Sequence, residues 1–381
     1  MPVATFVLGL AFPALAAGCW TGCLDPPVER LDTSPRTLSG PQLYVAPDGH
    51  DGRDCSSAAP CRQLERADAL AGPGTTINVA PGTYSPAILR SSGTGSAPIR
   101  FVSTERWAAA IRNAGMPHGA ILTVEGRHVD VEGFEVTSDV PADVDGIALA
   151  GSHSRAVGNL VHDLARPCRH SGGIVAGDAA YATHDVEIIG NFVHDIGEGP
   201  RNGSCSLLHG IYAAVPGVII ANNIVARALG DGITSWHAAT RLKIVNNTIV
   251  ANGQDGILLG NGDAGGTGTG NTGSYVANNI IVHNHGDAIS EGGPRAVSNT
   301  VVANTFYANG RDIFDQWGGS AEASTLIDDP AFDDLAADDF RPMPWSPVLG
   351  SGTAIGAPTT DFPGARRGTS ITRGAFQKPP R

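Results

Sequence analysis

Positive charge is scarce in this 381-residue sequence, which has only two lysines, Lys243 and Lys378, and a net charge of −12. Only 16% of the residues are charged and 6% are aromatic. A nucleic-acid partner is therefore not expected, because binding to phosphates needs Lys and Arg clustered on one surface. An acidic polymer could bind only through a local group of arginines or a bridging cation.

Hairpin signals and long apolar runs are also few. Asn-Gly turns do not recur at the regular spacing that an antiparallel sandwich would require. The apolar run within residues 1–18 is short and interrupted by Pro13, which argues against a membrane-spanning helix. The sequence has 50 glycines, which suits a turn-rich β fold, and the dominant pattern is a repeat.

The repeated unit is an apolar segment, an asparagine, a second apolar segment and a Gly-Ile pair, usually preceded by Asp. Successive asparagines are 32, 32, 24, 32 and 25 residues apart: Asn159, Asn191, Asn223, Asn247, Asn279 and Asn304. The isoleucines are Ile147, Ile174, Ile211, Ile233, Ile257, Ile289 and Ile313. One such unit cannot bury its apolar face alone, whereas stacked units form a continuous core. Asparagine tolerates left-handed turns, and stacked amides can hydrogen-bond along the stack. The repeat predicts an all-β fold, a right-handed parallel β-helix with three-strand rungs and an asparagine ladder over residues 85–327.

Two flanking segments carry a family resemblance. Residues 42–84 combine a first strand, a Gly/Asp loop, a short amphipathic helix at 62–70 and Pro-Gly-Thr-Tyr, and resemble the N-terminal cap of bacterial pectate-lyase-like β-helix proteins. Residues 328–381, with DDPAF, DDFRP and a final RGAF, resemble the ending of the choice-of-anchor group of surface β-helix proteins. The resemblance implies that this segment caps the far end of the coil. It also implies export, but no single activity, since the fold hosts lyases, hydrolases, epimerases and non-catalytic proteins.

The N-terminus and the cysteines also predict export. Residues 1–18 followed by Cys19 resemble a lipoprotein signal, although the usual basic residues before the apolar run are absent. A lipid on Cys19 would make residues 19–41 a tether at the outer membrane or cell surface; the alternative is simple secretion. Cys55 and Cys61 flank a short loop and are expected to pair. Cys168 and Cys205 lie in inserted loops at the same point of successive rungs, which predicts a second disulfide.

The long insertions flank the strands that begin with Gly-Ile. From Asn159 onward, the separation between each asparagine and the next isoleucine is 15, 20, 10, 10 and 10 residues. Returns after the isoleucines are also uneven, the longest spanning residues 261–273. Because insertions gathered on one face usually mark the binding face of a solenoid, we predict a groove there.

The residue two positions before each isoleucine forms a predicted column along this groove: Asp145, Gly172, His209, Asp231, Asp255 and Asp287. Carboxylates stacked one rung apart repel one another unless a cation compensates, which predicts Ca²⁺ at Asp231 and Asp255. The alternative is that Asp-Gly simply forms the turn that enters the strand.

A lyase that acts on a uronate polymer needs a neutralised carboxylate, a base and an acid. The sequence offers His209 or His170 as the base, Tyr212 as the acid and Arg169 or Arg201 as the clamp. Trp236 and His237 are candidates for substrate binding, although Trp236 could equally cover the end of a rung. Two further histidines, His162 and His194, lie in the repeated segments NLVHDL and NFVHDI and are predicted to be structural stacking partners.

Two functions remain open at this point. The first is an exported, monomeric, lyase-like protein that acts on an acidic polysaccharide or another glycan. The second is a non-catalytic surface lipoprotein or glycan-binding scaffold. The first requires His, Arg and acid side chains to come together around 169–170, 209–212 and 231–237, whereas the second predicts that they point apart. A lysine base is not expected, because Lys243, the only lysine among the rungs, has the pattern of a solvated strand position. The motif sets of polygalacturonases and mannuronan epimerases are missing.

Overall fold

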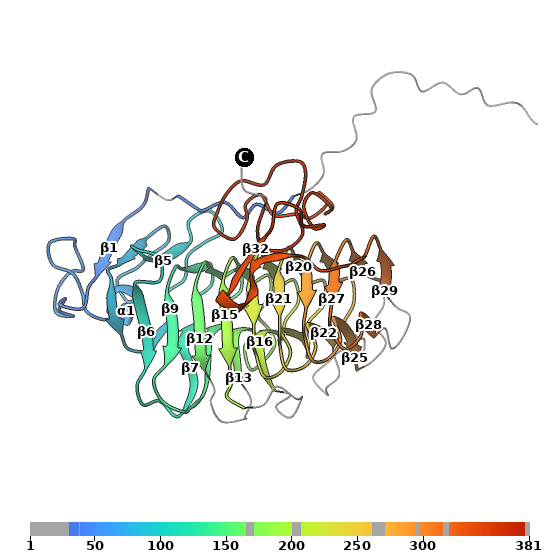
Figure 1. Ribbon diagram of the computed structural model, residues 1–381. Coiled ribbons are helices and arrows are strands. Elements are labelled where there is room, and N and C mark those ends of the chain that lie inside the picture. The colour runs from blue at the N-terminus through green and yellow to red at the C-terminus, as the bar shows by residue number, and fades with distance from the viewer. Residues whose placement is uncertain are drawn as a thin grey trace, which may run out of the picture.

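The chain winds into an elongated coil whose turns stack along one axis (Figure 1). The computed structural model describes residues 30–37, 39–164, 171–199, 207–260, 271–293, 298–314 and 320–377. Each turn of the coil contributes one strand to each of three long sheets, and neighbouring strands in these sheets are parallel. The molecule is therefore a parallel β-helix, as the repeat predicts.

The three sheets run the length of the coil. The 11-stranded sheet contains β1 (Gln42–Val45), β2 (Thr76–Val79), β5 (Ile99–Ser103), β8 (Val129–Glu132), β11 (Arg155–Val157), β14 (Glu187–Ile189), β17 (Ile219–Ala221), β20 (Lys243–Val245), β23 (Tyr275–Ala277), β26 (Asn299–Val302) and β29 (Ser320–Ala323). The 10-stranded sheet contains β3 (Gly82–Tyr84), β6 (Ala109–Asn113), β9 (Glu135–Ser138), β12 (Leu160–Leu164), β15 (Phe192–Ile196), β18 (Ile224–Ala226), β21 (Thr248–Val250), β24 (Ile280–Val282), β27 (Thr305–Tyr307) and β30 (Leu326–Ile327). The 9-stranded sheet contains β4 (Ala87–Leu89), β7 (His118–Val124), β10 (Asp143–Leu149), β13 (Ser171–Ala176), β16 (Leu208–Ala213), β19 (Ile233–Ser235), β22 (Ile257–Gly260), β25 (Ile289–Gly292) and β28 (Ile313–Phe314).

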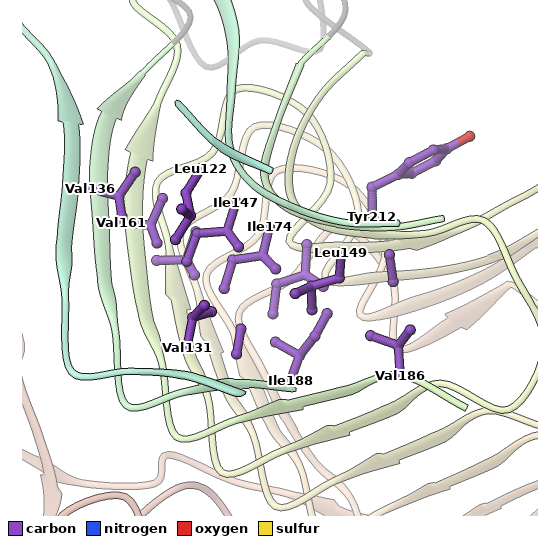
Figure 2. Close-up of a cluster of buried hydrophobic side chains, with 14 of the residues drawn as sticks. Leu122, Val131, Val136, Ile147, Leu149, Val161, Ile174, Val186, Ile188 and Tyr212 are labelled. Carbon is purple, nitrogen blue, oxygen red and sulfur yellow. The ribbon is translucent and has the colours of Figure 1, made fainter. Parts of the chain in front are cut away.

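The predicted isoleucine column is confirmed in full by the register of the 9-stranded sheet. Ile147, Ile174, Ile211, Ile233, Ile257, Ile289 and Ile313 are direct partners from one strand to the next. Apart from Ile313, each of these side chains is at most 1% exposed. Figure 2 shows how aliphatic side chains from the sheets fill the inside of the coil. Their burial removes apolar surface from water along the whole stack, which is the main stabilising term of such a solenoid.

The predicted asparagine ladder is also confirmed. Six buried asparagines, from Asn159 to Asn304, are linked side chain to side chain at 2.9 or 3.0 Å. Each acceptor amide oxygen also accepts the backbone N–H of the asparagine one rung earlier, as Asn247 does from Asn223 at 2.9 Å. These bonds satisfy backbone groups at a turn that lies inside the coil, where water cannot reach them.

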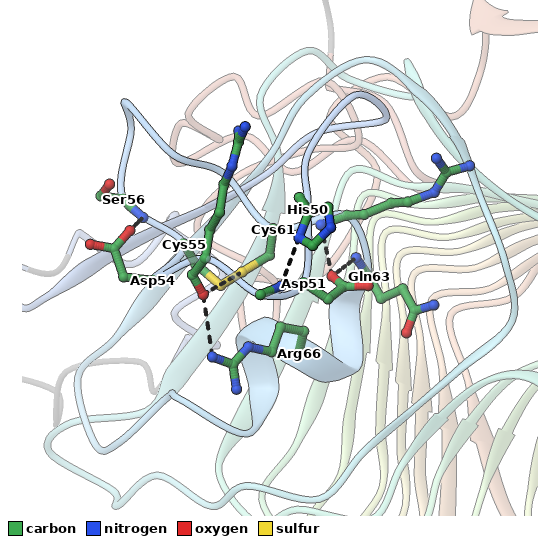
Figure 3. Close-up of a disulfide and its surroundings, with 11 residues drawn as sticks. His50, Asp51, Asp54, Cys55, Ser56, Cys61, Gln63 and Arg66 are labelled. Carbon is green, nitrogen blue, oxygen red and sulfur yellow. Dashed lines mark hydrogen bonds between the residues drawn. A yellow bond between two sulfur atoms is a disulfide. The ribbon is translucent and has the colours of Figure 1, made fainter.

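The N-terminal segment is held by a disulfide between Cys55 and Cys61, as predicted (Figure 3). Helix α1 (Leu64–Asp68) follows it and has five residues, fewer than the predicted 62–70. One carboxylate oxygen of Asp51 accepts the backbone N–H groups of Arg62 and Gln63 just before this helix, at 2.9 and 3.0 Å. Leu64 is buried and packs into the main core, so α1 is anchored to the first coils.

Two of the cysteine predictions fall on residues that the structure does not describe. Cys19, the predicted lipid site, lies in 1–29, and the proposed Cys168–Cys205 disulfide joins segments 165–170 and 200–206. Both stay predictions. Within the described ranges, no helix is long and apolar enough to cross a membrane.

The C-terminal segment does not lie over the last coil, where the sequence resemblance had placed it. After an antiparallel pair, β31 (Phe332–Asp334) and β32 (Asp339–Pro342), and the 3₁₀ helix η1 (Leu335–Ala337), it runs back along the side of the coil (Figure 1). Phe340, Val348 and Ala375 form a second apolar cluster with the outer faces of β18, β21 and β24. These three strands are apolar on both faces, and burial of the second face explains the position of the segment.

Polar contacts fix the same segment to the turns of successive coils. Asn222, Asn246 and Asn278 donate their side-chain N–H groups to its carbonyls at 2.7 to 3.2 Å. Arg367 is 2% exposed, and burial lowers its pKa to about 9. Its guanidinium donates to six acceptors in the segment and on Asn222. The C-terminal segment is thus fixed to the outside of the β-helix by both apolar and polar contacts.

Candidate functional site

The predicted column exists and lies at the entry to the 9-stranded sheet. Asp145, Gly172, His209, Asp231, Asp255 and Asp287 stand two residues before the aligned isoleucines in consecutive strands. Asp145 Oδ1 accepts the backbone N–H of Gly172 at 2.7 Å, and Asp231 and Asp255 accept the N–H of the next aspartate at 3.0 and 2.7 Å. Asp231, Asp255 and Asp287 therefore form a hydrogen-bonded ladder within the column.

The second carboxylate oxygens of this ladder also have protein donors. Asp231 Oδ2 accepts the Thr234 hydroxyl at 2.7 Å, and Asp255 Oδ2 accepts the Ser290 hydroxyl. Burial raises the pKa of Asp255, and the charge of Asp231 raises it further. At the end of the ladder, Arg311 forms two bonds of 2.8 Å to Asp287.

These contacts bear on the predicted calcium ion. Ca²⁺ takes six to eight oxygen ligands, whereas both carboxylate oxygens of Asp231 and of Asp255 are already engaged by N–H and O–H donors. Asp231 is also only 2% exposed. The described residues therefore fit a structural ladder better than a calcium centre, and calcium binding stays a prediction.

His209 is the member of the column with the surroundings of a base. Its Nδ1 lies 2.8 Å from the Thr234 hydroxyl oxygen and 3.4 Å from Asp231 Oδ2. A hydroxyl has one proton, and Thr234 donates it to the Asp231 carboxylate. Nδ1 of His209 must then be the donor to Thr234, so the neutral ring carries its proton on Nδ1. The Nε2 lone pair is consequently the basic site of the ring.

Tyr212 lies beside this histidine on the outer face of the sheet. Its neighbour Ile211 points into the core, and Figure 2 shows the Tyr212 ring projecting away from the apolar side chains inside the coil. The His209 and Tyr212 rings are stacked, with centroids 5.4 Å apart and planes 11° from parallel. The predicted base and the predicted acid are therefore side by side.

His237 extends the same group. Its ring meets Tyr212 edge-on at 5.9 Å and stacks on Tyr181 at 4.3 Å. His237 and Tyr181 both have left-handed backbone conformations, at φ 57° and 53°, in the returns that follow two strands of the 9-stranded sheet. His209, Tyr212, His237 and Tyr181, with Thr234 and Asp231, form what we call the outer-wall cluster.

Trp236 follows β19 and lies against the next strands of the same sheet. A Cβ atom on Gly260 would come within 2.2 Å of the Trp236 ring, so the ring lies directly against this glycine backbone. Gly292, one strand further, is also close to the ring. Trp236 is half-buried and packs against the main core. Both of its predicted roles, contact with a sugar and covering the end of a rung, stay predictions.

The remaining predicted site residues cannot be placed. Arg169 and His170 lie in 165–170 and Arg201 lies in 200–206, outside the described part of the chain. Two members of the outer-wall cluster were not singled out from the sequence, namely Thr234 and Tyr181. Thr234 is the position aligned with Tyr212 on the next strand, so the repeat register was the signal that could have found it.

The other repeated histidines are stacking partners, as predicted. The rings of His162 and His194 are 5.2 Å apart and 12° from parallel. Each Nδ1 contacts the aspartate that follows it, Asp163 at 2.8 Å and Asp195 at 2.7 Å. Charge-assisted bonds from His194 and Arg227 hold the pKa of Asp195 well below its usual range, although burial opposes this.

Known structures match the shape of the whole coil. The crystal structure of pectate lyase Pel9A superposes with a TM-score of 0.63, at 18% identity, over 89% of this chain and 96% of that one. A rhamnogalacturonan lyase superposes with a TM-score of 0.56, at 13% identity, over 78% of this chain and 92% of that one. This protein has the parallel β-helix fold of these lyases.

The sequence comparisons are more limited. No protein-family model matches the chain. The uncharacterized protein YwoF of Bacillus subtilis (strain 168) is 29% identical over 126 residues, which are 30% of this β-helix protein and 27% of YwoF. The matched segment thus spans little more than a quarter of that relative. Structural matches at such low sequence identity show the fold alone. Evidence for an activity has to come from the side chains of the outer-wall cluster.

Proposed function

We propose that this β-helix protein is an exported carbohydrate-active protein that cleaves an acidic polysaccharide by a lyase reaction. The observation that carries the proposal is the chain from His209 Nδ1 through the Thr234 hydroxyl to Asp231, which leaves Nε2 as a base next to Tyr212. The overlap in fold with pectate lyase Pel9A and a rhamnogalacturonan lyase supports the choice of substrate class.

The chemistry assigns one task to each side chain. Nε2 of His209 removes the proton next to the uronate carboxylate, and Asp231 stabilises the imidazolium that forms, through Thr234. The Tyr212 hydroxyl donates a proton to the departing glycosidic oxygen. Arg169 or Arg201 would neutralise the substrate carboxylate, and His237 would contact the sugar chain. Neutralisation by Ca²⁺ is the alternative that a chelator tests.

One observation favours a second candidate, a glycan-binding scaffold without catalysis. The side chains of His209 and Tyr212 are largely covered, and the residues are only 4% and 7% exposed. A polymer could then rest on the exposed rim without reaching either group. Binding without turnover would be the signature of this function.

A screen of pectate, alginate and chondroitin for unsaturated products, detected by their ultraviolet absorbance, tests the proposal. For any substrate that is cleaved, His209→Gln is expected to lower kcat by about 100-fold or more, the usual contribution of a positioned base. Tyr212→Phe keeps the stacked ring and removes only the hydroxyl, so a similar loss would assign the acid. Thr234→Val should lower activity and shift the pH profile, because it removes the partner that fixes the Nδ1 proton.

His162→Gln is the matched control, since it also removes an imidazole whose Nδ1 contacts an aspartate, but on the 10-stranded sheet. It should leave kcat unchanged. Unchanged turnover in His209→Gln would remove this residue from the mechanism, and binding of all three polymers without products would support the scaffold instead. Repeating the assay with a chelator separates calcium from arginine neutralisation.

A further inference from the structure

A second group of histidines lies at the corner where the chain leaves the 9-stranded sheet and enters the 11-stranded sheet. A residue one or two positions before the next strand has a left-handed conformation in each turn: His128, His153 and Asp185 have φ of 54°, 62° and 55°. Glycine or asparagine is the usual residue for this conformation, and the next corner does use Gly217. Three successive corners thus carry side chains that can bind metals, with His184 beside the last of them.

The ring planes change direction within this group. The rings of His128 and His153 are stacked at 4.7 Å and 7° from parallel, whereas those of His153 and His184 are 5.0 Å apart and perpendicular, at 89°. One ligand atom from each of His153, His184 and Asp185 lies within 4.8 Å of the other two.

Backbone contacts hold the three residues in place. The His184 N–H donates to Ser152 Oγ at 3.2 Å, and the His153 N–H donates to the His184 carbonyl at 3.2 Å. The Thr183 hydroxyl donates to the Ala150 carbonyl. The loop that carries His184 and Asp185 is therefore fixed against the turn that carries His153, before any ligand is present.

We propose that His153, His184 and Asp185 bind a divalent transition-metal ion of the zinc class. Two imidazoles and a carboxylate with one open position form a known zinc ligand set, whereas calcium prefers oxygen ligands alone. Ligand bonds of about 2.0–2.1 Å place tetrahedral ligands about 3.3 Å apart. His184 Nδ1 and Asp185 Oδ2 are already 2.9 Å apart, so a metal ion can replace the proton that they share.

His184 and Asp185 would close the remaining distance to His153 by side-chain rotation. The side chains of His184 and Asp185 are 40% and 56% exposed, so neither needs to displace core atoms in order to turn. The ion would join two successive coils at one corner. The loop between β13 and β14 carries His184, Asp185 and Tyr181, so the metal would also restrain the loop that supports the outer-wall cluster.

His162 and His194 show what the same residue types do without such a site. Their rings are nearly parallel, and each Nδ1 contacts its own aspartate. Among the described residues, His153, His184 and Asp185 are the only group of three His, Cys, Asp or Glu side chains with ligand atoms this close together. The proposal does not depend on the proposed lyase activity.

The test uses the tag-free, chelator-treated full chain, titrated with Zn²⁺ by calorimetry and with Co²⁺ by visible absorption. We expect one equivalent of Zn²⁺ to bind, a Co²⁺ spectrum of a four-coordinate site, and a higher thermal midpoint with metal. His184→Gln and His153→Gln should each weaken Zn²⁺ binding by about tenfold or more, since even supporting residues of a metal site contribute this much. His162→Gln should bind like the unchanged protein.

Because the His184 side chain is 40% exposed, His184→Gln should keep the metal-free circular dichroism spectrum and thermal midpoint, which separates loss of binding from loss of folding. The proposal is overturned if the unchanged protein binds no Zn²⁺. It is equally overturned if both variants keep the original affinity, which would place the ion elsewhere, or if His162→Gln loses binding to the same extent.

Discussion

Removal of one rung of the asparagine ladder should destabilise the whole coil. The Asn247 side chain is fully buried. Its oxygen accepts the backbone and side-chain N–H groups of Asn223 at 2.9 and 3.0 Å, and its nitrogen donates to the Ile220 carbonyl and to Asn279 at 2.9 and 3.0 Å. Asn247→Ala therefore deletes four hydrogen bonds at a fully buried site.

The magnitude follows from these four bonds. Each contributes about 1 kcal/mol net, so the free energy of unfolding should fall by about 4 kcal/mol. For a chain of this length, with an unfolding entropy of about 2.1 cal/mol/K per residue, the thermal midpoint should fall by about 5 °C. Asn304 closes the ladder with three bonds, to Asn279 and Val276, so Asn304→Ala should cost about 3 kcal/mol.

Urea unfolding followed by far-ultraviolet circular dichroism measures both changes. Asn247→Asp is the matched control for volume, because it has the same size but replaces a buried donor with an acceptor or a charge. It should be at least as destabilising as Asn247→Ala. A loss below 1 kcal/mol in Asn247→Ala, or a milder effect in Asn247→Asp, would show that the ladder is incidental to stability.

Three further changes test other parts of the fold. Arg367→Lys replaces a guanidinium that donates to six acceptors, and should release the C-terminal segment to limited proteolysis while the coil keeps its circular dichroism spectrum. Gly256→Ala would place a Cβ 2.2 Å from a methyl carbon of Ile281, and should lower the free energy of unfolding by about 1–3 kcal/mol in the same urea assay. Burial raises the pKa of Asp130 to about 6, so the folded state binds this proton more tightly than the unfolded state does. The contribution of this proton to the free energy of unfolding is complete below the unfolded pKa of about 3.9 and is lost as the pH rises through 6. In the wild-type protein the urea midpoint should therefore fall between these pH values, and Asp130→Asn should remove that part of the pH dependence.

The fold was readable from the sequence because one physical requirement repeats. Each rung needs an inward isoleucine after a turn and a buried asparagine to satisfy its backbone, so spacing alone gave the register of both columns. The same register located the His209 column. It could not reveal the hydroxyl bridge, because Thr234 becomes significant only when its distances to His209 and Asp231 are known.

The position of the C-terminal segment was not readable for a related reason. The segments IVA, TIV and IIV of β18, β21 and β24 are apolar at every position or nearly so, and the pattern does not say what covers the second face. Likewise, the sequence could not distinguish the perpendicular His153 and His184 rings from the parallel rings of His162 and His194. Ring orientation depends on local backbone angles, which the repeat does not encode.

The docking of the last 50 residues or so along the flank, rather than over the end, has a consequence for biogenesis. Ile224, Val250 and Ile280 lie in one apolar cluster with Phe340, Val348 and Ala375 of the C-terminal segment, which a ribosome makes later. A nascent or truncated chain that ends before residue 328 would expose the apolar outer face of β18, β21 and β24 to solvent. Such a fragment should self-associate. The C-terminal segment therefore has to dock on the coil before that apolar surface contacts another copy of the protein.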